Sequence, residues 1–75
     1  MSNPDAILRA FGQCVRKQRD TKHLTQEKLA ERANLDPTYI SGIERGKRNP
    51  GIKNVVRIAK ALGLTTAELC KGVDA

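Results

Sequence analysis

Aromatic residues are nearly absent from this chain of 75 residues, which has no tryptophan, one phenylalanine (Phe11) and one tyrosine (Tyr39). A buried core must therefore be built from leucine, isoleucine, valine and alanine. Hydrophobic residues make up 39% of the chain, which is enough for one core. A chain this short buries only about 60% of the surface that its unfolded form exposes. We therefore expect a single, marginally stable domain over residues 1–75, and dimerisation would stabilise it.

Cysteine and histidine are scarce, with Cys14, Cys70 and His23 the only examples. No Cys-x-x-Cys pair or other metal-ligand spacing occurs, so we expect no metal. We also expect no other cofactor and no small-molecule ligand. We expect both cysteines to be reduced thiols, with a disulfide as the alternative. His23 has no carboxylate or nucleophile at a suggestive spacing, which argues against an enzyme.

No apolar run approaches the length of a membrane span, and residues 1–4 lack the charged and apolar regions of a signal peptide. The net charge is +6, with a pI near 9.8. This excess indicates a polyanionic partner, either nucleic acid or an anionic membrane surface, although it is also compatible with solubility alone. We expect a cytoplasmic protein associated with the nucleoid and not with a membrane.

Apolar residues recur at spacings of three and four, and no segment alternates with a period of two, so we predict an all-α fold of five helices. The first helix begins near Asn3 or Pro4 and frays around residues 21–23. Its apolar stripe consists of Ile7, Leu8, Phe11, Cys14 and Val15. The second helix covers residues 26–33 after the hydroxyl cap Thr25, and Asn34 tolerates the left-handed turn that follows.

The remaining helices have clear ends. Asp36 and Pro37 start the third helix, which stops at Gly46. A basic loop leads to the fourth helix, residues 52–62, whose apolar residues begin with Ile52. The sequence Thr65-Thr66-Ala67-Glu68 forms a capping box for the fifth helix, which ends at Gly72.

The two short helices over residues 26–33 and 37–45 flank a turn of about three residues, the spacing of a helix-turn-helix. Small residues, Ala30 and Ala33, stand where such helices cross. Leu29, Leu35, Ile40 and Ile43 fill the space between them. Spacing alone leaves open an ordinary helical hairpin in an unrelated bundle.

The stretch Leu24-Thr25-Gln26-Glu27-Lys28-Leu29-Ala30, followed by Tyr39-Ile40-Ser41-Gly42-Ile43-Glu44-Arg45-Gly46, resembles the phage repressor and Cro (Xre) family of helix-turn-helix proteins. Together with the following Lys47-Arg48-Asn49-Pro50, it is most similar to the controller proteins of restriction–modification systems. The resemblance covers roughly residues 15 to 70. It implies the lambda-repressor-like fold, with the third helix in the major groove of double-stranded DNA.

A helical wheel divides the third helix into two sides. One side carries Ile40, Ile43 and Glu44, and the opposite side faces the groove. That groove-facing set is Pro37, Thr38, Ser41, Gly42 and Arg45. Thr38 and Ser41 suit base edges or phosphate, and Arg45 suits guanine or phosphate. Gly42 would allow a close approach to DNA, or it is simply a tolerated helix glycine.

Other residues take their roles from the resemblance. Gln26 is implied to clamp a phosphate at the start of the second helix. We expect Lys47, Arg48 and Asn49 to contact the DNA backbone, the alternative being a solvated basic loop. Tyr39 lies at the margin of the core, where a DNA contact and a buried ring with an exposed hydroxyl are both open.

Three further expectations concern stability, specificity and function. The resemblance implies a structural ion pair between Arg19 and Glu44, whose disruption would cost about 3–5 kcal/mol if buried. Similar controller proteins often carry a longer polar residue where Pro37 stands. The operator sequences of those proteins therefore cannot be assigned to this chain. We predict a transcriptional regulator acting as a homodimer on an inverted repeat. We expect the dimer surface on the fourth and fifth helices, particularly around residues 64–73, the alternative being that these helices only close the core. The alternative is an antitoxin or another protein-interaction module on the same fold.

Overall fold

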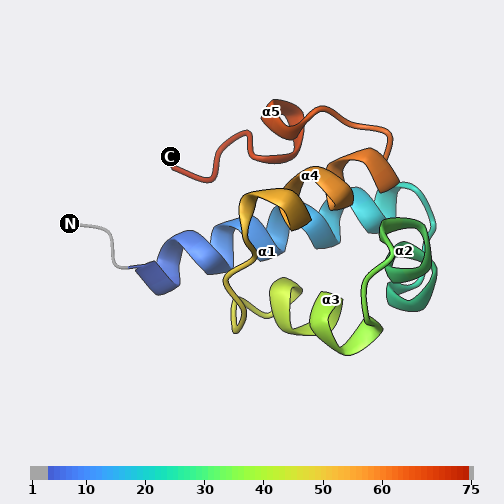
Figure 1. Ribbon diagram of the computed structural model, residues 1–75. Coiled ribbons are helices and arrows are strands. Elements are labelled where there is room, and N and C mark those ends of the chain that lie inside the picture. Colours follow the sequence, from blue (N-terminus) through green and yellow to red (C-terminus); the bar gives the residue numbers. More distant parts are fainter. Residues whose placement is uncertain (1–3, 75) are drawn as a thin grey trace.

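Five helices follow one another in the computed structural model, which describes residues 4–74. They are α1 (Pro4–Thr21), α2 (Gln26–Ala33), α3 (Pro37–Glu44), α4 (Ile52–Ala61) and α5 (Thr66–Leu69). No strand occurs within this part of the chain, so the predicted all-α fold is confirmed. In Figure 1, α4 and α5 lie above α1, and α3 lies below it. The cap expected at Asn3 lies outside the described residues.

Short polar side chains set the starts of the helices, as the sequence predicts. Thr25 accepts a hydrogen bond from the backbone N–H three residues later at 3.0 Å, and Asp36 accepts one from two residues later at 2.7 Å. These bonds satisfy N–H groups that have no partner inside the helix. The capping box of α5 is complete, because Thr65 and Glu68 each bond to the backbone N–H of the other. Local chemistry alone therefore fixes where three of the helices begin.

The end of α1 differs from the expected fraying. The chain leaves the helix in an ordered turn in which His23 adopts a left-handed backbone with φ of 58°. The N–H of Leu24 donates to the carbonyl of Arg19 at 3.1 Å and closes this turn. The helix α4 ends one residue earlier than predicted, with Leu62 as its C-cap. Turn hydrogen bonds after the last full helical turn account for both differences.

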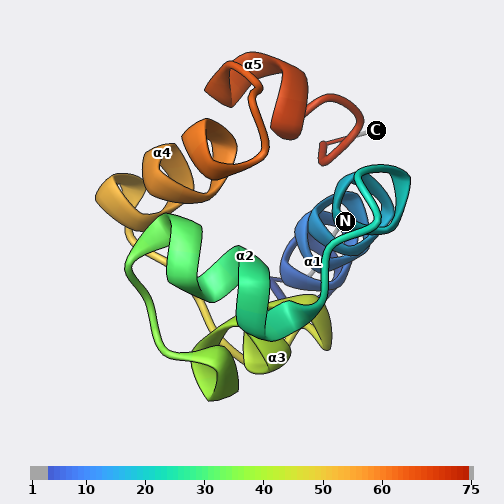
Figure 2. The ribbon, with the colours of Figure 1, turned by 90° about the vertical axis from the view of Figure 1, so that its right-hand side faces the viewer.

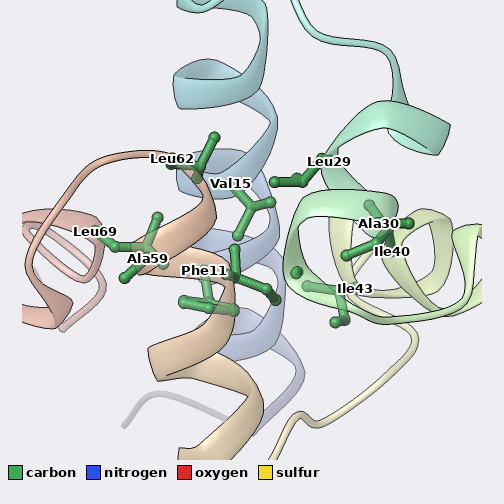
Figure 3. Close-up of a cluster of buried hydrophobic side chains, with 11 residues drawn as sticks. Phe11, Val15, Leu29, Ala30, Ile40, Ile43, Ala59, Leu62 and Leu69 are labelled. Atoms are coloured by element: carbon green, nitrogen blue, oxygen red, sulfur yellow. The ribbon is translucent and has the colours of Figure 1, made fainter.

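The core lies along one side of α1. Figure 3 shows Phe11 and Val15 between Leu62, the C-cap of α4, and Ile43 of α3. The apolar residues of the buried cluster come from all five helices or their caps, and they are Phe11, Val15, Leu29, Ala30, Ala33, Ile40, Ile43, Ile58, Ala59, Leu62 and Leu69. The helix α2 packs against both α3 and α4 and joins the two sides of the bundle (Figure 2). Because α3 is held on its inner side by this core, its opposite side is free to face a ligand.

Two large residues of the predicted apolar stripes are exposed. Ile7 is 43% exposed and Ile52 is 71% exposed. Each lies in the first turns of its helix, beyond the point where a neighbouring helix covers that face. Helical periodicity identifies the apolar side of a helix but does not show how far along it the cover extends.

One close approach was not predicted. Gly12 is buried where α1 crosses α3, and a Cβ there would lie 2.7 Å from the carbonyl oxygen of Glu44 and would also overlap the carbonyl of Ile43. Only glycine lets the two helices come so near. This contact fixes the depth at which α3 sits on α1.

Candidate DNA-binding surface

The helices α2 and α3 form the predicted helix-turn-helix. Asn34 takes the left-handed conformation with φ of 57°, and the N–H of Leu35 donates to the carbonyl of Ala30 at 2.9 Å. Ala30 and Ala33 are buried where the helices meet. Their small side chains let α2 pack closely on α3, and this places α3 at the surface of the bundle.

Glu44 anchors the end of α3 through a buried ion pair with Arg19 of α1. The Nε of Arg19 donates to Oε2 at 2.7 Å and its Nη2 donates to Oε1 at 3.0 Å. The side chain of Glu44 is 3% exposed and that of Arg19 is 12% exposed. The hydrogen bond with Glu44 raises the pKa of Arg19, although burial opposes this effect. Both members of the expected pair are thus present in a bidentate arrangement.

Gln26 joins the same cluster. Its Nε2 donates to Oε1 of Glu44 at 3.0 Å, while Nη1 of Arg19 donates to the carbonyl of Leu24 at 2.8 Å. The carboxylate therefore links α1, the first residue of α2 and the end of α3. Sequence reasoning assigned Gln26 only to phosphate and did not foresee this bond. An amide nitrogen carries two hydrogens, so one remains for another acceptor.

The outward side of α3 carries the residues of the predicted groove-facing set, with one exception. Pro37, Thr38 and Arg45 are exposed and Ser41 is half-buried. The Nε of Arg45 donates to the carbonyl of Ser41 at 3.3 Å, which leaves its Nη groups for other partners. These four residues give α3 a mixed apolar and hydrogen-bonding surface.

Gly42 is the exception, because it is buried. A Cβ at this position would lie 2.6 Å from Cγ of Arg48. The side chain of Arg48 thus runs over α3 at the position of Gly42. The wheel could not show this cover, since it considers one helix without the loop that follows.

The loop after α3 extends this surface. Lys47, Arg48 and Asn49 are exposed, and the N–H of Lys47 donates to the carbonyl of Gly42 at 2.8 Å. Within residues 4–74, no carboxylate pairs with Lys47, Arg48 or Arg45. The loop and α3 therefore present three cations whose charge the described residues do not neutralise.

Tyr39 lies between these regions. Its ring is half-buried against the core, and its hydroxyl accepts a hydrogen bond from Nδ2 of Asn54 in α4 at 3.1 Å. Asn54 had not been singled out from the sequence, where its place in α4 gave no signal. The hydroxyl keeps its own hydrogen to donate.

Among the described residues, no helix is both long and apolar enough to cross a membrane. The structure also places no group of three histidine, cysteine or acidic side chains together for a metal ion within that part of the chain.

Comparison with known proteins agrees with this geometry. Residues 15–69 match the helix-turn-helix family model. The control protein C.BamHI of Bacillus amyloliquefaciens is 50% identical over 70 residues, which cover 92% of this chain and 84% of that protein. C.MunI of a Mycoplasma species is 42% identical over 85% of this chain and 88% of its own length.

Solved structures give the same result. The controller protein C.AhdI of Aeromonas hydrophila superposes with a TM-score of 0.81 and 44% identity, over 83% of this chain and 94% of its own. C.Esp1396I, solved as a tetramer with its natural 35 base-pair operator, superposes with a TM-score of 0.82 and 40% identity, over 91% of this chain and 90% of its own. This chain belongs to the helix-turn-helix family of the phage repressor and Cro (Xre) type, and it is similar to restriction–modification controller proteins. By class it is a DNA-binding transcriptional regulator and not an enzyme.

Proposed function

We propose that this protein binds an inverted-repeat operator as a homodimer and regulates transcription as a restriction–modification controller. The observation that carries the proposal is the outward side of α3, where hydrogen-bonding side chains continue into a loop of unpaired cations. Hydrogen-bonding side chains read base edges, and cations bind phosphates. Its place of action is then the DNA of the nucleoid, in the cytoplasm.

Each surface residue has a role in this proposal. Thr38, Ser41 and Arg45 contact base edges, and Pro37 offers only an apolar contact, which suits the methyl group of thymine. Lys47, Arg48 and Asn49 bind phosphates. Gln26 uses one amide hydrogen on Glu44 and has another to donate to a phosphate oxygen. The Tyr39 hydroxyl accepts from Asn54 and can donate its own hydrogen to a phosphate oxygen. Gly42 contributes by leaving room for Arg48 beside the helix.

A second copy of the chain is proposed to bind at an uncharged groove of about 210 Å³. This groove, called here the apolar groove, is lined mainly by Ile7, Phe11, Ile52, Val55, Cys70 and Val73. No charged residue lines it, whereas each copy carries a net charge of +6. At an uncharged surface two such chains can meet without bringing like charges together, and the exposed side chain of Ile52 is part of the apolar lining. The expected dimer surface on α4 and α5 would thus include the start of α1.

Selection of bound sites from random duplex DNA tests the proposal. We expect an enriched inverted repeat whose half-sites lie about one helical turn apart, since two α3 helices related by a two-fold axis enter successive major grooves. Affinity should fall with salt by a log–log slope of about −0.9 for each phosphate contacted. No enrichment, or a slope near zero, would contradict operator binding.

A matched pair of variants separates reading from positioning. Arg45→Ala should change the selected sequence at one position in each half-site and cost about 1–3 kcal/mol there. Lys47→Ala should weaken all duplexes to the same degree and lower the salt slope by about one. If Arg45→Ala left both preference and affinity unchanged, α3 would not be the reading helix.

Sedimentation equilibrium tests the dimer. Ile52→Gln should weaken self-association without unfolding the chain, because that side chain is 71% exposed. Lys28→Gln, on the exposed side of α2, provides the control and should leave self-association unchanged.

A further inference from the structure

Two cysteines from opposite ends of the chain lie on either side of the contact between α1 and the end of α5. Cys14 of α1 and Cys70, the C-cap of α5, are both free and half-buried. The Sγ of Cys14 lies 3.7 Å from the carbonyl oxygen of Lys71, to which it donates. Lys71 is the residue next to Cys70, so the backbone that carries one thiol is in contact with the other.

The surroundings of the thiols support this proximity. Cys14 lines a depression of about 160 Å³ together with Leu69 and Lys71, the two chain neighbours of Cys70. Burial raises the pKa of the Cys70 thiol, and the nearby Cys14 adds a smaller contribution in the same direction. The two cysteines therefore border the same packing contact, where α1 meets the end of α5.

From this arrangement we infer that Cys14 and Cys70 form an oxidation site, at which a peroxide converts the two thiols into an intrachain disulfide. Cys14 attacks one oxygen of hydrogen peroxide, gives a sulfenic acid and releases water. The sulfur of Cys70 then displaces the hydroxyl group from Cys14, and a second water leaves as the S–S bond forms. Two thiols and one peroxide thus yield one disulfide and two waters, and the peroxide is the oxidant.

The order of the steps follows from the two environments. Cys14 borders a depression that water and peroxide can enter, so it is oxidised first. Cys70 stays protonated to a higher pH because burial raises its pKa, and this makes it the poorer first nucleophile. Disulfides in cytosolic proteins are mostly of this transient, redox-sensing kind.

The disulfide would also change the apolar groove. Cys70 lines that groove, whereas Cys14 lines the other depression and not the groove. A bond between them turns the Cys70 side chain away from the groove and holds the C-terminal turn against α1. This part of the inference rests on the proposed dimer, and it makes self-association weaker in the oxidised protein.

The first experiment concerns the bond alone. The folded full chain is treated with hydrogen peroxide, and its free thiols and intact mass are measured. We expect both thiols to disappear with the loss of two hydrogens from a single chain, and a reductant to restore them. Cys14→Ser and Cys70→Ala cannot form this bond, so neither should lose two hydrogens. Cys70→Ala should instead stop at the sulfenic acid of Cys14, with a mass gain of one oxygen. Thiols that persist in the wild-type chain, or disulfides that join two chains, would overturn the inference.

The second experiment measures self-association of the reduced and oxidised forms by sedimentation equilibrium. We expect the dimer of the oxidised form to be weaker by about tenfold, the size of effect found for the minority of interface side chains that matter most to binding. An unchanged dimer would overturn the link between oxidation and the groove. A reduced protein that never dimerises would instead contradict the proposed homodimer. The first experiment would still decide whether the disulfide forms, because that bond lies within one chain.

Discussion

Replacing Glu44 with glutamine should show how much stability depends on the ion pair behind α3. The carboxylate accepts two hydrogen bonds from Arg19 and one from Gln26. In Glu44→Gln, an amide NH₂ takes the place of one carboxylate oxygen and faces these donors. The charge of Arg19 then has no buried counter-charge, although that side chain keeps its bond to the carbonyl of Leu24.

The size of the effect can be derived from this geometry. Breaking a buried ion pair by removing one partner costs about 3–5 kcal/mol. The retained bond of Arg19 and its 12% exposure favour the lower end, about 3 kcal/mol. At roughly 0.05–0.15 kcal/mol per residue, a chain of 75 residues has about 4–11 kcal/mol of total stability. The midpoint of thermal unfolding should therefore fall by about 12–24 °C.

Thermal and urea unfolding followed by far-UV circular dichroism provide the measurement. Glu31→Gln is the matched control, because Glu31 meets Lys28 at 3.4 Å on the exposed face of α2. That pair should contribute less than about 1 kcal/mol. A loss below about 1 kcal/mol for Glu44→Gln, or equal losses for the two variants, would refute the reasoning.

Three other changes test the backbone and the caps. Gly12→Ala should lower stability by about 2 kcal/mol in urea unfolding despite the helix preference of alanine, because its Cβ meets the backbone of α3; equal or higher stability would contradict that contact. His23→Gly should raise the free energy of unfolding by about 0.5–1 kcal/mol, and with it the unfolding midpoint, because glycine adopts a φ of 58° without strain. A lower midpoint would show that the turn at His23 is not strained. Hydrogen bonds with Thr65 lower the pKa of Glu68. The Glu68 carboxylate therefore contributes its full stabilisation of the fold above the ordinary pKa of glutamate, and this stabilisation is lost as the pH falls through the lowered pKa. In unfolding midpoints measured against pH, Glu68→Gln should therefore reduce the acid-side loss, and an unchanged pH profile would count against the capping box.

Local chemistry made much of the fold predictable. Thr25, Asp36 and Thr65 cap the helices that they were expected to cap, because a cap depends on residues only two or three positions apart. The pairing of Arg19 with Glu44 came from family resemblance, since nothing in their separation along the chain indicates it. The DNA contacts stay predictions, because they depend on a partner molecule.

Features that depend on several elements at once were not predictable. The exposure of Ile52 depends on where α4 extends past its neighbours, and periodicity carries no information on that point. The bond from Asn54 to Tyr39 joins two helices whose relative rotation is set by the whole core. Gly12 gave a weak signal, a glycine inside a strongly helical segment, which indicates a close approach but not to which element.

The position of Arg48 over Gly42 has a consequence for how the protein would search DNA. The loop that carries Lys47 and Arg48 is packed on α3 and bonded to it, so the structure holds the loop and the helix in one arrangement. In the proposed function, a chain held on arbitrary DNA by its loop already has α3 aligned with the major groove. Each displacement along the duplex then tests a new register without a folding step, and the time spent at a site depends on dissociation alone.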